Sequence, residues 1–240
     1  TKFVMTGGNN DSFTVRCGSL LPSTLYYIKA YVVTEAGISY GNERSFTTAA
    51  PSPGNVIISN QVWMTKNLDV SNYRNGDPIP QVSTGEWGSL TTGAWCWYNN
   101  DSATYASTYG KLYNWYAVND PRGLAPEGWH IPTRNDWNIL DTIFVAWFFA
   151  GGDLKEAGTT HWRSPNFGAT NISGFTALPN GLRFEEGTSF FSIGEYANWW
   201  GEASQTLYVA DMHYISYLGR PRQLGGRDKN SGLAVRCIKD

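Results

Sequence analysis

Apolar residues recur at helical spacing near the middle of the chain. The stripe consists of Trp137, Leu140, Phe144 and Trp147. Residues three and four apart share one face of an α-helix, so this pattern predicts a helix with one apolar face. Thr133 is a good N-cap, and Asp136 three residues later can close a shortened capping box with it. We expect Gly151-Gly152 to end the helix, because glycine readily takes the left-handed conformation at helix C-termini.

Alternation of apolar and polar residues predicts strands towards both ends of the chain. The strand segments are 12–17, 25–33, 44–48, 206–217 and 232–238. Between them, Leu112, Trp115 and Tyr116 lie three and four residues apart and predict a short amphipathic helix. Leu154 to Ala157 is compatible with a further helical turn.

The strand 206–217 presents two different faces. One face carries Tyr208, Ala210, Met212 and Tyr214, and the other carries Val209, Asp211, His213 and Ile215. We expect the first face to pack on the core. The second face has two polar members, so we expect it to be at least partly exposed. In the closing strand, Leu233, Val235 and Cys237 share one face.

Residues 1–49 contain a recognisable β pattern. The run Leu-Leu-Pro-Ser-Thr-Leu-Tyr-Tyr-Ile-Lys-Ala-Tyr begins at Leu20, and Ala-Gly-Ile-Ser-Tyr-Gly-Asn and Ser-Phe-Thr-Thr follow it. These runs resemble the C-terminal half of a fibronectin type III domain. A complete sandwich needs about 100 residues, so we expect a partial all-β sandwich whose other strands lie upstream or in another chain. Residues 50–55 form a Pro/Gly linker, and the second domain spans 56–240.

The second domain carries several aromatic and glycine motifs. They are Gly-Ala-Trp-Cys-Trp-Tyr-Asn-Asn-Asp from Gly93, Gly-Trp-His-Ile-Pro-Thr from Gly128, Gly-Phe-Thr-Ala-Leu-Pro-Asn-Gly from Gly174 and Gly-Leu-Ala-Val-Arg-Cys from Gly232. Together they resemble the Fibrobacter succinogenes major paralogous domain over about residues 59–240. The resemblance implies an α+β fold of the C-type-lectin-like type, shared with formylglycine-generating enzymes. It has two main helices against short, twisted antiparallel sheets.

Composition narrows the set of partners. The formal net charge is −2 and 16% of residues are charged, so nothing indicates binding to nucleic acid or electrostatic attachment to a membrane. No apolar run is long enough to span a bilayer. The 36 aromatic residues (11 Trp, 14 Tyr and 11 Phe) mostly predict core packing in a turn-rich protein.

Cysteine and histidine give little support for catalysis, and we assign no catalytic residue. Cys96 and Cys237 lie on predicted strands, and two interpretations stay open: a Cys96–Cys237 disulfide, which we favour, or two buried thiols. Formylglycine-generating enzymes need a closely spaced cysteine pair near the C-terminus that binds copper, whereas this chain has only Cys237 there. No histidine has a second ligand at metal-binding spacing. We therefore predict no cofactor and no enzyme activity.

Calcium is the one metal for which the sequence offers ligands. Asn99 to Ser102 and Asn119-Asp120 supply oxygen atoms. Two interpretations stay open, a structural calcium site or solvated loop oxygens. The Glu-Pro-Asn or Gln-Pro-Asp triplet of calcium-dependent C-type lectins is absent. The similar run Leu178-Pro179-Asn180 lacks the carboxylate or amide of the first residue.

The C-terminal strands and loops combine Trp, Tyr, Arg and polar residues, the types that interface hot spots favour. The candidate ligand-binding residues are Trp200, Glu202, Gln205, Asp211, His213, Tyr217, Arg220, Arg222, Gln223 and Arg227. They predict a secreted or surface-displayed, non-enzymatic module that binds a glycan or protein on a cell surface or matrix. The alternative is a structural stalk or pilus-tip domain without its own ligand. C-type-lectin-like folds also serve as scaffolds of diversity-generating retroelements, which suggests that 201–229 is diversified.

Overall fold

The structure, a computed structural model, describes residues 25–47, 54–143, 150–219 and 222–240. The chain divides into two compact units, with the boundary between Pro53 and Gly54. Several predicted features lie outside the described residues: the strand 12–17 with Cys17, most of the linker, Phe144, Trp147 and Arg220.

The described part of the first unit is a single antiparallel hairpin. It consists of β1 (Leu25–Thr34) and β2 (Gly37–Thr47), in the region where strands 25–33 and 44–48 were predicted. Many of its large apolar side chains are exposed: Leu25, Tyr27, Ile28, Val32, Val33, Ile38, Tyr40 and Phe46. The hairpin therefore buries little of the apolar surface that a packed sandwich would bury.

The second unit contains eleven strands among its described residues. They are β3 (Asn55–Ile58), β4 (Gln61–Met64), β5 (Trp95–Cys96), β6 (Leu112–Tyr113), β7 (Trp129–His130), β8 (Asn180–Arg183), β9 (Phe190–Ile193), β10 (Tyr196–Ser204), β11 (Val209–Ser216), β12 (Gln223–Asp228) and β13 (Ile238–Lys239). Four small sheets result, with the orders β10-β11-β12, β3-β4-β13-β7, β5-β6 and β8-β9, and the pairs within them are antiparallel.

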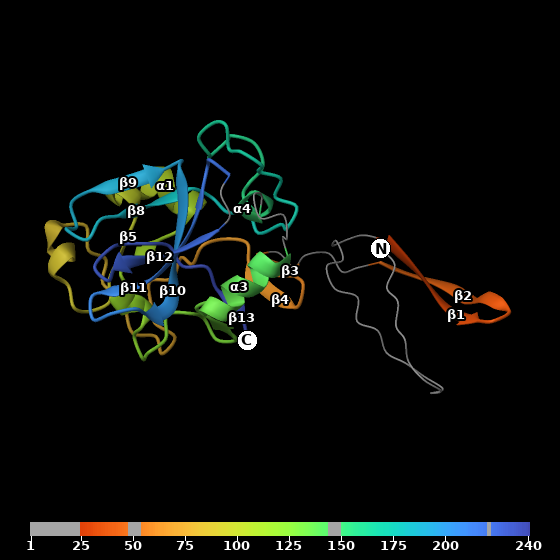
Figure 1. Ribbon diagram of the computed structural model, residues 1–240. Coiled ribbons are helices and arrows are strands. Elements are labelled where there is room, and N and C mark those ends of the chain that lie inside the picture. Colours follow the sequence, from red (N-terminus) through yellow and green to blue (C-terminus); the bar gives the residue numbers. More distant parts are fainter. Residues whose placement is uncertain (1–24, 48–53, 144–149, 220–221) are drawn as a thin grey trace. The chain divides into compact units, whose positions relative to one another are not determined.

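Helices in the described part of this unit are short. They are α1 (Ser102–Tyr109), α2 (Trp115–Val118), α3 (Arg134–Ile143) and α4 (Ala150–Leu154), with two 3-10 turns, η1 (Gly85–Ser89) and η2 (Tyr98–Asn100). The second unit is therefore an α+β structure with small antiparallel sheets, as the sequence predicted. Figure 1 shows α3 beside β10 and β4, and Gln61 of β4 donates a hydrogen bond to the Asp136 carbonyl.

The predicted start of the central helix is confirmed. The Thr133 amide donates to Oδ2 of Asp136 (2.9 Å), and the Asp136 amide donates to Oγ1 of Thr133 (3.2 Å), so the capping box closes in both directions. Trp137 and Leu140 are fully buried, as the stripe predicted.

The predicted end of that helix is wrong, because Gly151 and Gly152 lie inside α4. Gly152 packs directly against another backbone segment, and a Cβ on it would lie 2.1 Å from the Gly168 carbonyl oxygen. The glycine is thus needed for close packing, not for a C-cap. Leu154 ends α4, so the predicted turn 154–157 is also wrong.

Two further elements differ from the prediction. Leu112 belongs to β6, and the short helix begins only at Trp115, where Asn114 caps it by accepting from the Ala117 amide. The closing strand 232–238 is reduced to β13 and to isolated bridges that Gly232, Leu233 and Ala234 make with three different segments. Its alternation still holds, since Leu233, Val235 and Cys237 pack in one hydrophobic cluster.

The prediction that one face of the strand 206–217 packs on the core holds for Ala210, which is buried, but the predicted exposure of the other face is wrong. Asp211, His213 and Ile215 are buried, whereas Tyr208 is exposed and Tyr214 is only half-buried. The strand lies between two packed layers. The layer that covers the polar face contains α3, whose Trp137 stacks on the His213 ring with centroids 4.8 Å apart.

Candidate functional site

Four of the ten candidate ligand-binding residues are buried, so they do not form the exposed face that was predicted. They are Trp200, Asp211, His213 and Arg222. Their assignment to an exposed face is therefore wrong. Helix α3 covers three of them: Arg134 pairs with Asp211, Asp141 pairs with Arg222, and the Trp137 ring stacks on His213. Trp200 packs in the hydrophobic cluster that also contains Ala210 and Leu233.

A polar layer joins α3 to the C-terminal sheet. Arg134 donates to both carboxylate oxygens of Asp211, from Nε at 2.5 Å and from Nη2 at 2.8 Å. Arg222 donates from Nε to Asp141 at 3.1 Å and also contacts the second Asp141 oxygen and Nδ1 of His213. Asp211 of β11 and Arg222 just before β12 can be buried because α3 supplies each of them with a partner of opposite charge.

Burial in this layer changes the protonation of its members. Burial lowers the pKa of His213 to about 3, and repulsion from Arg222 acts in the same direction. For Asp211, burial alone would raise the pKa, but hydrogen bonds from Arg134 and Gln205 outweigh it and hold the pKa below its usual value. At neutral pH Asp211 is therefore a carboxylate and His213 is an uncharged imidazole.

The other candidate residues lie nearer the surface. Glu202 and Gln205 are exposed, and Tyr217, Gln223 and Arg227 are half-buried. The half-buried members are engaged within the protein. Arg227 lies over the Phe184 ring at 4.3 Å, and Gln223 accepts from the Tyr214 hydroxyl. Only part of the predicted surface therefore remains accessible to a partner.

The hairpin tip, which we define as residues 204–209, joins β10 to β11, and Gln205 was the one residue in it predicted to bind a ligand. Its side chains Leu207 and Tyr208 are 75% and 68% exposed. Its backbone is held firmly, because the buried Lys229 donates from Nζ to the carbonyls of Thr206 and Leu207, each at 3.0 Å. The tip thus presents two large apolar side chains on a fixed backbone.

Further contacts tie the tip to the sheet. Oγ1 of Thr206 accepts from the amides of Tyr208 (3.2 Å) and Val209 (3.0 Å), and the Gln205 side chain donates to Asp211 at 2.8 Å. The tip is therefore linked through Gln205 to the polar layer below it.

Cys96 and Cys237 are free, buried thiols, so the favoured Cys96–Cys237 disulfide is wrong. The two residues pack in different hydrophobic clusters. Burial raises the pKa of Cys96 to about 11 and that of Cys237 to about 12. Both stay protonated at neutral pH, and a protonated thiol is a poor nucleophile and a poor metal ligand.

The segments considered for calcium have other roles in this structure. Asp101 caps α1 by accepting from the Thr104 amide at 3.1 Å, and Asp120 pairs with Arg122 at 2.9 Å. Among the described residues, no group of three or more His, Cys, Asp or Glu side chains is arranged to hold a metal ion.

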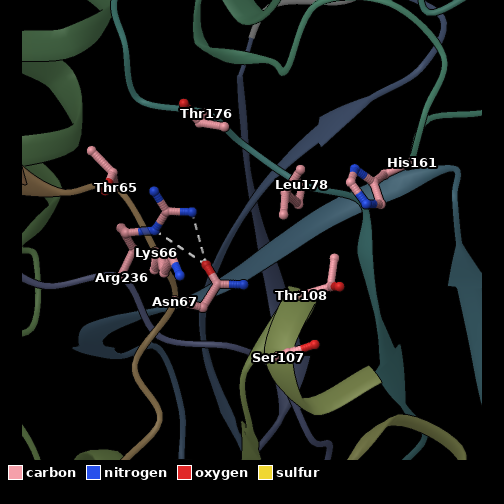
Figure 2. Close-up of a pocket in the computed structure, with 9 residues that line it drawn as sticks. All are labelled: Thr65, Lys66, Asn67, Ser107, Thr108, His161, Thr176, Leu178 and Arg236. Carbon is pink, nitrogen blue, oxygen red and sulfur yellow. Dashed lines mark hydrogen bonds between the residues drawn. The ribbon is translucent and has the colours of Figure 1, made fainter. Parts of the chain in front are cut away.

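A cavity of about 350 Å³ opens at the surface, and none of the ten candidate ligand-binding residues lines it (Figure 2). Its lining residues are Thr65, Lys66, Asn67, Ser107, Thr108, His161, Thr176, Leu178 and Arg236. They come from the loop after β4, the C-terminal turn of α1, the long connection between α4 and β8, and the closing segment. Figure 2 shows Arg236 and Asn67 on one side of the cavity and Ser107, Thr108 and His161 on the other.

Arg236 forms the buried wall of the cavity and is only 1% exposed. Asn67 Oδ1 accepts from its Nε (3.1 Å) and Nη2 (3.0 Å), and the Met64 and Phe175 carbonyls accept from Nη1. The guanidinium also lies over the Phe175 ring at 4.4 Å. Burial lowers the pKa of Arg236 to about 9, so the group is still charged at neutral pH.

His161 on the opposite wall is oriented by an acidic partner. Its Nδ1 lies 2.9 Å from both carboxylate oxygens of Glu156, and its ring packs edge-on against Tyr109. Because a carboxylate only accepts hydrogen bonds, Nδ1 carries the proton. Nε2 is then available to a group inside the cavity.

Sequence analysis did not predict this cavity. The sequence shows no metal-binding partner near His161, and Arg236 lies within the predicted closing strand 232–238. Their contribution to one site depends on contacts between segments that are more than 70 residues apart. The Gly-Leu-Ala-Val-Arg-Cys motif places an arginine in an otherwise apolar run, and this was the one available signal.

These features define an aromatic-rich α+β domain with an exposed hairpin tip and a separate polar cavity. The profile of the Fibrobacter succinogenes major domain matches residues 56–239, and the chain belongs to this family. Comparison with curated proteins and with solved structures finds no match. Among the described helices, none has the length and apolar character needed to cross a membrane.

Proposed function

We propose that the second unit is a non-enzymatic binding module, secreted or displayed at the cell surface, that recognises a protein or a glycan through its C-terminal face. The hairpin tip carries this proposal. Leu207 and Tyr208 are exposed on a backbone that Lys229 holds in one conformation. Exposed apolar side chains on a fixed backbone lose little conformational entropy when a partner covers them.

The surroundings of the tip suit an interface. Tyr208 offers an aromatic ring with a polar end, a residue type enriched in binding hot spots. Glu202 and Gln205 are exposed beside it, and Arg227 pairs with Ala210 across the neighbouring strands β11 and β12. An apolar centre with polar neighbours is the usual arrangement of a protein–protein interface.

The absence of enzymatic activity remains part of the proposal. Both described thiols are buried with raised pKa values, and His213 is stacked and uncharged beneath α3. The one histidine at the cavity is paired with Glu156. We also propose that the fold is C-type-lectin-like, with α1 and α3 as its two main helices, as the family resemblance implies.

Two other proposals concern the context of the module. The exposed apolar side chains of the β1–β2 hairpin support a neighbouring domain or chain that completes the sandwich. Diversification by a retroelement within 201–229 is compatible with the tip at Leu207 and Tyr208, which are exposed. The conformation of the tip depends instead on the side chains of Gln205, Thr206 and Lys229. Sequencing the locus in clonal relatives would reveal an excess of changes in this window.

The test compares two double variants of the full chain on an array of glycans and extracellular proteins. In the first, Leu207→Ser and Tyr208→Ser remove the apolar centre of the tip. We expect binding to weaken by about 30-fold, which corresponds to about 2 kcal/mol at a hot spot. The matched control is Ile57→Ser with Ile172→Ser, two exposed isoleucines elsewhere in the domain, and it should bind normally.

Equal binding by both double variants would place the ligand elsewhere. Binding of no array member by the wild-type chain would favour the alternative of a structural stalk or tip domain. Retained thermal stability in both variants is required, since all four side chains are largely exposed.

A further inference from the structure

The cavity of Figure 2 shares no residue with the hairpin tip and has its own electrostatic character. Two cationic side chains, Lys66 and Arg236, line it, and the lining contains neither Asp nor Glu. Glu156, an acid that contacts the lining residue His161, is already paired with that histidine. An anionic group that enters the cavity would therefore meet positive charge without an opposing carboxylate on the wall.

Arg236 has hydrogen-bonding capacity to spare on this wall. A guanidinium has five N–H groups, and four hydrogen bonds reach Asn67, Met64 and Phe175 within the described part of the chain. One N–H of Nη2 is left over. The partners in these four bonds are neutral oxygens, so the buried charge has no counter-ion there.

Several neighbouring groups hold this guanidinium in one orientation. Asn67 Oδ1 accepts from Arg236 and also from Nε1 of the buried Trp199 at 2.9 Å. Rings of Phe175 and Trp199 lie 4.4 and 5.9 Å from the guanidinium carbon. A charged donor held in one orientation by several neutral groups is suited to bind an oxyanion, because charge-assisted hydrogen bonds are stronger than neutral ones.

The opposite wall has a different chemistry. Ser107 and Thr108 contribute hydroxyl groups from the last turn of α1, and His161 contributes Nε2. Hydroxyl groups both donate and accept, and Nε2 of His161 can form a further hydrogen bond. These groups suit the hydroxyls of a ligand better than its charge.

We propose that the cavity binds a small hydroxylated carboxylate, namely a uronic acid unit of an acidic glycan. Its carboxylate would lie against Arg236 and Lys66, and its hydroxyls against the wall formed by Ser107, Thr108 and His161. The volume of about 350 Å³ lies at the lower end of the range of small-molecule sites, which fits a single sugar unit.

The test is an NMR titration of the full chain with glucuronate, glucose and acetate at low salt, observed at the Trp199 indole N–H. This proton reports on Asn67, which Arg236 shares. We expect glucuronate to bind at least about tenfold more tightly than glucose, the loss expected for one charge-assisted contact. Acetate should bind more weakly than glucuronate, since it lacks the hydroxyls.

Single substitutions test which wall of the cavity binds the carboxylate and which binds the hydroxyls of the ligand. Lys66→Gln should weaken glucuronate binding by roughly three- to tenfold and make it less sensitive to salt, and Thr108→Val should weaken glucuronate but not acetate. Lys239→Gln, which changes an exposed lysine outside the cavity, is the matched control and should have no effect. Equal affinities for glucuronate and glucose, or wild-type affinity in Lys66→Gln, would overturn the proposal. Equal affinities for glucuronate and acetate would overturn the role of the hydroxyl wall.

Discussion

The middle of β11 and the hairpin tip that precedes it use their side chains in opposite ways. Within the strand, the charged Asp211 and the polar His213 are buried. A few residues earlier, the apolar Leu207 and the aromatic Tyr208 are exposed. Polarity alone would assign each pair to the other environment. The difference shows that burial here is decided by the partners that each position meets.

The partners explain both halves of this comparison. Helix α3 places Arg134 and Asp141 opposite the strand, so that Asp211 and Arg222 each gain a paired, hydrogen-bonded charge. The tip has no such cover, and its backbone carbonyls are satisfied instead by Lys229 from below. The Leu207 and Tyr208 side chains of the tip remain exposed for contacts with another molecule.

Removal of Arg222 should have the largest effect on this comparison. The Arg222 side chain is only 4% exposed and pairs with Asp141. Arg222→Ala leaves Nδ1 of His213 without its donor and removes packing beside the Trp137 ring. We expect a loss of about 3 kcal/mol, the range for breaking a buried pair, and a Tm lower by roughly 6–12 °C, measured by calorimetry.

The control for Arg222→Ala changes an arginine that is paired at the surface. Arg163 contacts Glu195, and its side chain is 62% exposed. Arg163→Ala should cost less than about 1 kcal/mol, as exposed ion pairs do. Equal losses in the two variants would mean that the polar layer contributes no more than an ordinary surface contact.

The stability of the polar layer should also depend on pH. The pKa of His213 is about 3 in the folded chain and about 6.5 in the unfolded chain. Between these values the unfolded chain binds a proton that the folded chain does not, so stability falls as the pH falls from about 6.5 towards 3. The slope reaches about 1.4 kcal/mol per pH unit. Denaturant unfolding at pH 7.5 and 5.0 measures it.

A His213→Gln variant isolates this contribution from the other titrating groups. Between the two pH values the wild type should lose about 2 kcal/mol more than the variant, because only the wild type has this imidazole. Asp211 adds a loss only below about pH 4, because its ordinary pKa is near 3.9 and its folded pKa lies lower still. An identical pH dependence in both proteins would show that His213 is not held uncharged.

Local signals in the sequence predicted the elements that depend on neighbouring residues. The capping box of Thr133 and Asp136 and the buried positions Trp137 and Leu140 follow from spacing within one helix. Helix α1 was missed, because its Ser, Thr and Tyr residues are weak helix formers and its buried face is small. The role of Gly152 depends on the Gly168 carbonyl, which no local pattern reveals.

The candidate site was less predictable for the same reason. The phase of β11 was assigned from polarity, but α3 supplies partners from about 75 residues away, as Arg134 and Asp211 show. The cavity brings together Lys66, Thr108, His161 and Arg236, which lie in separate parts of the sequence. The family was identified from motifs that specify the core, and core motifs carry little information about the accessible surface.

Removal of the Lys229 hydrogen bonds to the hairpin tip should have the smallest effect on stability but a clear effect on binding. Lys229→Met keeps an unbranched apolar side chain but removes the ammonium, which donates to the Thr206 and Leu207 carbonyls and lies 4.5 Å from the centre of the Trp115 ring. Water can replace part of this donor at the surface, so we expect a loss of only about 1 kcal/mol. Hydrogen exchange at the Gln205 and Thr206 amides, both bonded to the Val209 carbonyl, should accelerate. Binding through the tip should weaken because the backbone is no longer held in one conformation.

The exposed Lys239→Met is the control. Unchanged exchange at both amides in Lys229→Met would show that the tip is rigid without this lysine, and the argument from preorganisation would then fail.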